Sequence, residues 1–286
     1  MDFGGSQRRN ANQDVSFEAV IEDCRVLLKA LQSICFGDRA TVIVNQQGII
    51  LKVEQAKCCQ LSIFLEWALF KEAPTIGDQF SFSINSKELI MFLSIFAGDA
   101  DVDPAYESKN AETNLKLRYK GMGDPFYLLI EKNECITECK LYTFDPQDSL
   151  NIELDEADIN NKAILDVSYY KEIWADFDSA SKELGIEFTK DPECLRFITK
   201  SSYEKSAIEL YPNCEGVITL SCEEDQLNFY QMSFIKLSQK ILNQACKFNL
   251  STNSDGLLSM TFIIQVESER VAFARFFCVA NRPDEL

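Results

Sequence analysis

The chain has 286 residues, of which 46% are hydrophobic, with a formal net charge of −17 and a pI near 4.5. A net charge of this sign repels polyanions, so nucleic-acid binding requires basic residues gathered on one surface. The eleven cysteines, an odd number without a secretory leader, indicate reduced thiols, and the lack of histidine excludes Ser-His or Cys-His catalysis and His-ligated metals.

The first half of the chain predicts strands around two helices. Residues 1–16 are polar and predict a mobile arm, while apolar residues at helical spacing over 22–36 predict a first helix. Ser86 is expected to cap a second helix with core positions Leu89, Phe92, Leu93 and Phe96, followed by a loop over 98–112. The strands expected here are 17–21, 40–45, 48–54, 60–67, 79–85, 114–120, 126–131 and 135–143.

The second half repeats this order after an acidic run, Asp145 to Asp158, which has six acids and no base and predicts an extended linker. A helix is expected over 169–184 and another from Ser233. The strands expected here are 163–167, 186–190, 195–200, 206–211, one before Ser233, 247–251, 257–266 and 270–279.

An internal duplication relates the two halves. Asp78-Gln79 and Ser86 recur as Asp225-Gln226 and Ser233, each 147 positions later. The expected fold class is α+β, with two similar domains whose helices pack on the same side of antiparallel sheets. The expected division is an arm (1–16), domain 1 (17–143), linker (144–160), domain 2 (161–280) and tail (281–286).

Cysteines and acids are the candidates for chemistry. Cys58 and Cys59 are adjacent, and Cys135 and Cys139 share a strand face about 13 Å apart. Structural thiols are the favoured interpretation, with a metal site or redox pair as the alternative. The acids are concentrated in loops, which favours a solvated surface over a metal-dependent nuclease. No glycine-rich phosphate loop is present, so the sequence predicts no catalytic residue, cofactor or metal.

Basic residues on the expected helices are more informative than the acids. From Cys24 to Phe36 and from Ser233 to Phe248 the chain has no acid, although it has 45 in all. Each helix alone could be an ordinary solvated face; together they predict a positive surface that contacts phosphates without reading sequence. The candidate DNA-facing residues are Arg25, Lys29, Lys87, Lys171, Lys182, Lys236, Lys240 and Lys247.

Four runs carry a resemblance to a known family: FGDRATVIVNQQGIILKVEQAKCCQLSIFLEWALFKE, SINSKELIMFLSIFA, LKLRYKGMGDPFYLLIE and GLLSMTFIIQVESERVAFARFFC. Over roughly residues 17–279 the sequence resembles the Rad-one-type subunit of the heterotrimeric checkpoint clamp, the nine-one-one complex, within the PCNA-like DNA clamps. The resemblance implies a pseudo-sixfold ring that encircles double-stranded DNA at damage sites and serves as a platform for checkpoint signalling and repair.

The resemblance also implies partners and further sites. The partners would be Rad-nine-like and Hus-one-like clamp subunits and a clamp loader with a Rad-seventeen-like subunit, in the nucleus. Ring closure would use edge strands. The candidate edge residues are Cys135, Thr137, Cys139 and Leu141 in the first domain, and Ser206, Ile208 and Leu210 in the second. A partner-peptide pocket would lie near Cys58, Leu61, Phe144 and Leu150.

Two other functions stay open on the sequence. One is a metal-dependent 3′-5′ DNA exonuclease, which would need particular carboxylates to converge. The other is a homotrimeric replicative processivity clamp, which would need no different partner subunit.

Overall fold

The computed structural model describes residues 17–74, 76–97, 114–132, 135–146, 152–177, 180–201, 205–266 and 270–281. The predictions for the arm 1–16, the loop 98–112, the side chain of Phe96, Leu150 and the tail beyond residue 281 lie outside these residues. None of the described helices is long and apolar enough to cross a membrane.

The first half contains every strand and helix predicted for it. Its elements are β1 (Phe17–Ile21), α1 (Cys24–Leu31), the 3-10 helix η1 (Gln32–Phe36), β2 (Arg39–Val44), β3 (Gly48–Gln55), β4 (Cys59–Glu66), η2 (Trp67–Leu69), β5 (Phe80–Asn85), α2 (Ser86–Ala97), β6 (Asn114–Tyr119), β7 (Phe126–Lys132) and β8 (Cys135–Leu141).

The cap predicted for α2 is wrong by one residue. The Asn85 side chain accepts the N–H of Glu88 at 3.0 Å, so Asn85 caps the helix. The Ser86 hydroxyl instead donates to the Gly37 carbonyl. A buried hydroxyl thus ties the start of α2 to the turn before β2.

The second half differs more from the prediction. Its elements are η3 (Glu156–Asp158), β9 (Ile159–Leu165), α3 (Val167–Ala175), β10 (Glu183–Lys190), β11 (Glu193–Lys200), β12 (Lys205–Leu210), β13 (Val217–Cys222), β14 (Gln226–Gln231), α4 (Met232–Ile235), η4 (Lys236–Ser238), α5 (Gln239–Gln244), β15 (Ala245–Asn253), β16 (Leu258–Gln265) and β17 (Val271–Cys278).

Three corrections follow from these bounds. The helix expected over 169–184 ends at Ala175, because residues 181–183 already join the sheet: the Ser181 hydroxyl accepts the N–H of Lys200 at 3.0 Å and donates to the Glu183 carbonyl at 2.6 Å. The helix from Ser233 is split into α4, η4 and α5 and ends at Gln244. Strand β13 was not predicted; it pairs with β9.

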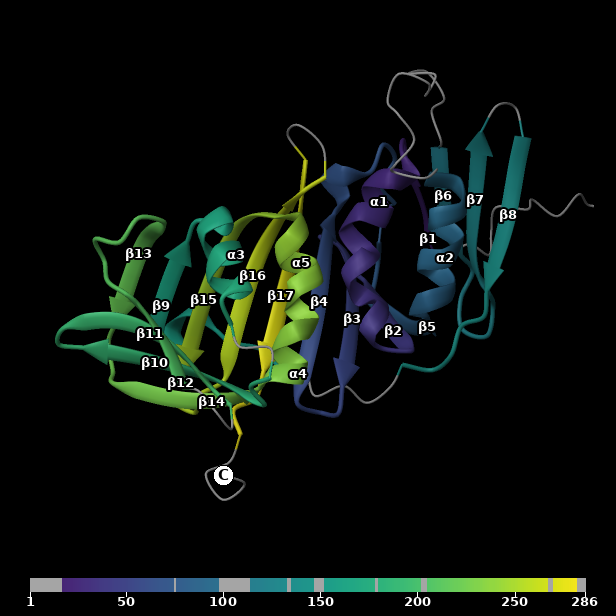
Figure 1. Cartoon of the computed structure of the whole chain (residues 1–286). Helices are drawn as coiled ribbons and strands as arrows, with labels where there is room; N and C mark the ends of the chain where they lie inside the picture. Colours follow the sequence, from purple (N-terminus) through teal and green to yellow (C-terminus); the bar gives the residue numbers. More distant parts are fainter. Residues whose placement is uncertain are drawn as a thin grey trace, which may run out of the picture.

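The same sheet connectivity occurs twice (Figure 1). The order β1-β6-β7-β8 of the first half corresponds to β9-β15-β16-β17 of the second, where β13 is added beside β9. The order β4-β3-β2-β5 corresponds to β12-β11-β10-β14. Strand β17 pairs antiparallel with β4, from Phe273 opposite Phe64 to Cys278 opposite Cys59, and this pairing fuses the two halves into one nine-stranded sheet.

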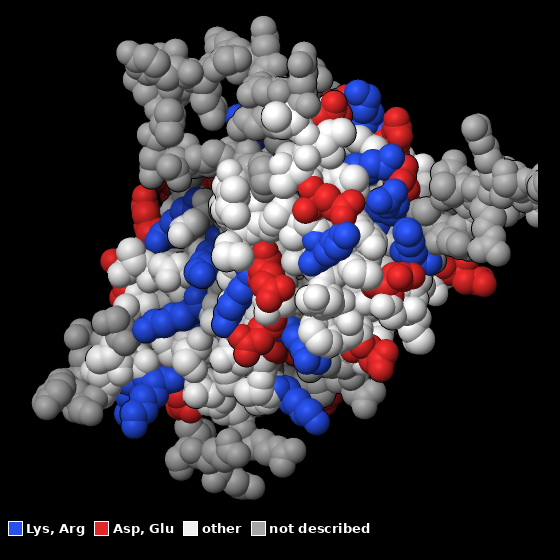
Figure 2. All heavy atoms as spheres, turned by 90° about the vertical axis from the view of Figure 1, so that its right-hand side faces the viewer, with Lys and Arg blue, Asp and Glu red and all other residues white. Residues whose placement is uncertain are grey.

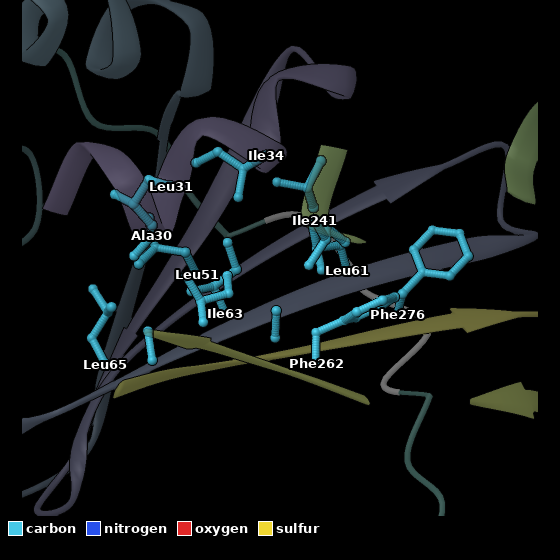
Figure 3. Close-up of a cluster of buried hydrophobic side chains, with 14 of the residues drawn as sticks. Ala30, Leu31, Ile34, Leu51, Leu61, Ile63, Leu65, Ile241, Phe262 and Phe276 are labelled. Atoms are coloured by element: carbon cyan, nitrogen blue, oxygen red, sulfur yellow. The ribbon is translucent and has the colours of Figure 1, made fainter. Parts of the chain in front are cut away.

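The helices α1 to α5 lie on one side of the nine-stranded sheet (Figure 1), as predicted. Beneath them, Leu31 and Ile34 of the first half and Ile241 of the second approach Leu61 and Phe276 of the sheet, all fully or almost fully buried (Figure 3). Because side chains alternate along a strand, every second residue of β4 and β17 enters this core. The two halves therefore share one hydrophobic core across their junction.

Candidate nucleic-acid interface and ring edges

The described helices are enriched in cations. Apart from η3 in the acidic linker, they carry six, Arg25, Lys29, Lys87, Lys171, Lys236 and Lys240, and only two acids, Glu88 and Glu172, in a chain of net charge −17. Because the helices share one side of the sheet, the cations of both halves lie in one layer. Such a layer is locally positive in spite of the acidic average.

Two of these lysines belong to different halves of the chain and lie near the same residue, Cys35. Lys87 at the start of α2 and Lys240 in α5 both lower the pKa of the Cys35 thiol in η1, although burial outweighs them and leaves that pKa raised. A hydrogen bond of 2.8 Å from the Gln244 amide to the Gln32 side chain joins α5 to η1 nearby. Basic side chains of both halves therefore lie near each other at the junction.

Nearby acids neutralise part of this charge. Arg25 pairs with Asp23 at 2.8 Å, and the same carboxylate caps α1. Lys87 pairs with Asp38 at 2.6 Å, which lowers the pKa of that carboxyl. Lys29 and Lys240 are exposed and make no ion pair within the described part of the chain. These two lysines offer their charge most directly to a ligand.

The remaining candidate cations do not all lie on the helix layer. Lys171 Nζ donates to the Asn243 carbonyl at 3.2 Å, at the end of α5, where the helix dipole favours a cation. Lys236 is exposed on η4. Lys182 precedes β10 instead of extending α3, and it lines a shallow hollow together with Lys236.

Lys247 is a clear correction. It lies in β15, where its neighbour Phe248 is buried and stacks on Tyr170 of α3, with ring centroids 4.2 Å apart. Side chains alternate along a strand, so Lys247 points to the face away from the helices. Its predicted place on the basic helix surface is wrong.

Both predicted edge strands are edges of their sheets: β8 ends one four-stranded sheet and β12 ends the other. In β8, Cys135 is exposed, Thr137 and Cys139 are half-buried, and Leu141 is buried. In β12, Ser206 and Ile208 are half-buried and Leu210 is buried. Each edge therefore presents unpaired backbone groups beside a partly apolar surface.

The internal repeat relates these two edges to each other. Strand β8 is the counterpart of β17, and β12 is the counterpart of β4. Strands β17 and β4 pair within the chain, whereas their counterparts β8 and β12 present the equivalent two edges and stay unpaired. A β8 edge can thus pair with the β12 edge of a neighbouring subunit as β17 pairs with β4.

The structure does not bring the predicted partner-peptide residues together. Leu61 is fully buried beneath the helices, so it cannot line a surface pocket. Cys58 lies in the turn before β4, whereas Phe144 pairs with Ser83 on the outer side of β5, four strand spacings or about 19 Å away across the sheet. Leu150 lies outside the described residues. This part of the prediction is corrected.

A buried glutamine that the sequence analysis did not single out holds the segment between the halves. The Gln60 amide donates to the Ile152 carbonyl at 3.2 Å and accepts the Ile152 N–H at 3.3 Å. Gln60 is 1% exposed, so its two bonds replace water that it cannot reach. The only sequence signal was a polar residue inside an apolar strand.

The adjacent cysteines belong to the scaffold. Burial raises the pKa of Cys59 to about 12 and also raises that of Cys278, which faces it across the β4–β17 pair. Within the described ranges, no group of three or more Cys, Asp or Glu side chains is placed to hold a metal ion.

The buried thiols predict selective alkylation. At pH 8, a pKa of about 12 leaves about one Cys59 in ten thousand as the reactive thiolate. Iodoacetamide should therefore modify the exposed Cys135 and Cys246 and leave Cys59 and Cys278 unmodified, as read by peptide mass spectrometry. In guanidinium chloride all should react. Equal native rates at Cys59 and Cys135 would contradict the assignment.

Comparison with known proteins agrees with this architecture. A family model described as "Repair protein Rad1/Rec1/Rad17" matches residues 16–264. The chain belongs to the Rad1/Rec1/Rad17 family. Among Rad1-family relatives, the human "Cell cycle checkpoint protein RAD1" is 28% identical over 279 residues, which cover 98% of this chain and 95% of that protein. The "DNA repair protein Rad1" of Drosophila melanogaster is 24% identical over 274 residues, which cover 93% and 94%.

The fold of this Rad1-family chain is that of a sliding clamp. The crystal structure of proliferating cellular nuclear antigen from Entamoeba histolytica superposes with a TM-score of 0.71 at 17% identity, covering 94% of this chain and 100% of that one. The α+β, two-domain clamp class predicted from the sequence is confirmed.

Proposed function

We propose that this Rad1-family chain is a non-enzymatic subunit of a heterotrimeric ring clamp that encircles DNA at damage sites and supports checkpoint signalling and repair. The single observation that carries the proposal is the repeat of the β17–β4 junction as two unpaired edges, β8 and β12. The relatives named as checkpoint and repair proteins supply the cellular role.

Ring closure follows from that repeat. One chain supplies two similar domains joined by a β17–β4 pair, and three chains joined by β8–β12 pairs continue the same relation around a pseudo-sixfold ring. Antiparallel pairing satisfies the backbone groups that an edge exposes, so each junction gains hydrogen bonds along a strand. The two edges of one chain would then meet two neighbours.

The helix layer is the surface that would face DNA. A ring needs only a modest positive potential over its lumen, felt within a Debye length of about 8 Å at physiological salt. Lys29 and Lys240 provide this charge without base contacts, so binding would be independent of sequence and would weaken with salt.

The partners in this proposal are two different clamp subunits, Rad-nine-like and Hus-one-like, and a clamp loader with a Rad-seventeen-like subunit. The place of action is the nucleus. The family membership and the clamp fold support a multi-subunit clamp, and the two dissimilar edges of the chain allow each neighbour to be a different protein.

Complex formation with the two partner subunits tests the proposed contact through the edge strand β12. Ile208→Asp places an unpaired charge at the β12 edge and should reduce 1:1:1 complex formation with the two partners more than tenfold, measured by gel filtration with light scattering. The matched control is Ile218→Asp on β13, an exposed isoleucine on an edge strand that is no part of the repeat, and it should leave assembly unchanged. Circular dichroism checks that both variants fold.

Two outcomes would contradict the proposal. If the two variants assembled equally well, β12 would not be part of the contact between ring subunits. A trimer formed by this chain alone would make it a homotrimeric processivity clamp instead.

A further inference from the structure

A basic and aromatic surface lies on the face of the sheet β1-β6-β7-β8 that points away from the core and from α2. Tyr127 of β7 is surrounded there by three cations: Arg118 at 5.3 Å, Lys120 at 6.0 Å and Lys140 at 5.6 Å from the ring centroid. Figure 2 views the molecule from the side where β8 lies in Figure 1 and shows short runs of Lys and Arg with Asp and Glu between them. We call these four residues the Tyr127 cluster.

A hollow with an apolar floor and a charged rim adjoins this cluster; the polar residues that line it are Lys71, Glu72, Asn114, Lys116 and Glu131. It has a volume of about 450 Å³ and is lined by Val20 of β1, Leu129 of β7 and Ile136 of β8, which is 69% exposed. The Val20 N–H donates to the Glu72 carbonyl at 3.1 Å, so the segment at residues 71–72 closes one side. We call this the Leu129 hollow.

Two buried polar atoms beside these features lack a partner within the described residues. They are Nε of Arg118, in the Tyr127 cluster, and Oδ1 of Asn114, in the wall of the Leu129 hollow. A buried donor or acceptor left without a hydrogen bond is costly. Arg118 can thus still donate to an acceptor, such as a carboxylate, and Asn114 can still accept from a donor, such as a peptide N–H.

The spacing fits one short extended segment. Tyr127 and Leu129 are two residues apart on one face of β7, which separates the cluster from the hollow by about 7 Å. That is the distance between side chains two positions apart in an extended peptide. A ligand could therefore place a carboxylate at the cluster and an apolar side chain in the hollow at once.

The charge of this face favours a peptide over a nucleic acid. Lys116 is paired with Glu18 at 2.5 Å and Lys140 with Glu138 at 2.9 Å, and Glu131 lines the hollow. A phosphate backbone crossing the face would place a charge beside each of these acids, whereas a segment with one or two carboxylates can place them at the Tyr127 cluster alone. The planar guanidinium of Arg118 suits a carboxylate, since it can donate two parallel hydrogen bonds.

We propose that the Tyr127 cluster and the Leu129 hollow together bind a short acidic segment of another protein, with its carboxylate on Arg118 and its apolar side chain beside Leu129. The edge β12 and the helix layer take no part, whereas Lys140 and Ile136 lie on the other proposed ring edge, β8. Binding is therefore tested on this chain alone, without the partner subunits and without DNA, so that its result does not depend on ring assembly.

Fluorescence anisotropy with the full chain tests this. The probes are labelled peptides Gly-Glu-Asp-Ala-Leu-Gly and its reverse sequence, with Ala replacing Leu as a second probe. Arg118→Glu combined with Lys120→Glu should weaken binding of the better peptide at least tenfold, because both attractive charges become repulsive. Ile136→Ser should weaken it several-fold without unfolding, since Ile136 is largely exposed.

The matched control is Lys57→Glu combined with Lys162→Glu, which makes the same charge change outside this face and should bind like the unaltered chain. Loss of binding in the control would assign the effect to net charge and overturn the proposal. No binding of either peptide would also overturn it. So would tighter binding of an oligothymidine strand that is lost with the same Arg118 variant, because a nucleic acid would then be the ligand.

Discussion

Replacing Phe276 with alanine is expected to lower the free energy of unfolding by about 3–5 kcal/mol, the usual cost of deleting a buried aromatic ring. Phe276 lies in β17 with no exposed surface, opposite Leu61 of β4 (Figure 3). The cavity would open where β17 and β4 join the two halves, beneath helices from both. Urea unfolding followed by circular dichroism measures the loss.

Phe273→Ala is the matched control for this prediction. Phe273 lies three residues earlier in the same strand, but it is only half-buried and points to the opposite face of the sheet. Losing part of its buried area should cost about 1 kcal/mol. Equal losses for the two phenylalanines would mean that the shared core beneath the helices does not hold the junction.

Reversing Lys29 and Lys240 together to glutamate is expected to weaken retention of the assembled ring on nicked circular DNA about 10–100-fold. Exposed charge contacts contribute about 0.2–1 kcal/mol each, and reversal replaces attraction with repulsion. Loss of two phosphate contacts should also lower the slope of log affinity against log salt by about two. Retention is measured by gel filtration of loaded circles at several salt concentrations.

The control again uses Lys57→Glu with Lys162→Glu, which changes the net charge equally but away from the helix layer. It should retain DNA like the unaltered ring. Unchanged retention in the Lys29 and Lys240 variant would mean that the helix layer does not contact DNA. A double variant of Arg25 and Lys87 should lose less, because Asp23 and Asp38 already neutralise those cations.

Sequence patterns predicted elements better than their ends. Apolar residues at helical spacing located α1 and α2, and alternation located the strands of the first half. The end of α3 was missed because Ser181 is held by hydrogen bonds to Lys200 of β11 and Glu183 pairs with Gln231 of β14, both distant in sequence from the helix start. Strand β13 was missed because its short apolar alternation is stabilised by pairing with β9, more than fifty residues earlier.

For the candidate site as well, local patterns were predictable from the sequence and long-range contacts were not. The stripe of Arg25 and Lys29 could be read from helical spacing, but not that Asp23 pairs with Arg25. The place of Lys247 could not be read, since it depends on where α5 ends and β15 begins. The burial of Leu61 likewise depends on helices from both halves covering β4.

The sequence by itself determined the class of the elements, the duplication of the halves and the concentration of cations on the helices, because periodicity and composition are local properties. Only the tertiary structure decided that β17 pairs with β4, that β8 and β12 stay unpaired, and which lysines keep their charge free of nearby acids. The physical reason is that strand pairing and ion pairs join residues far apart in the chain. A local pattern shows that a face is buried, but it does not show what buries it.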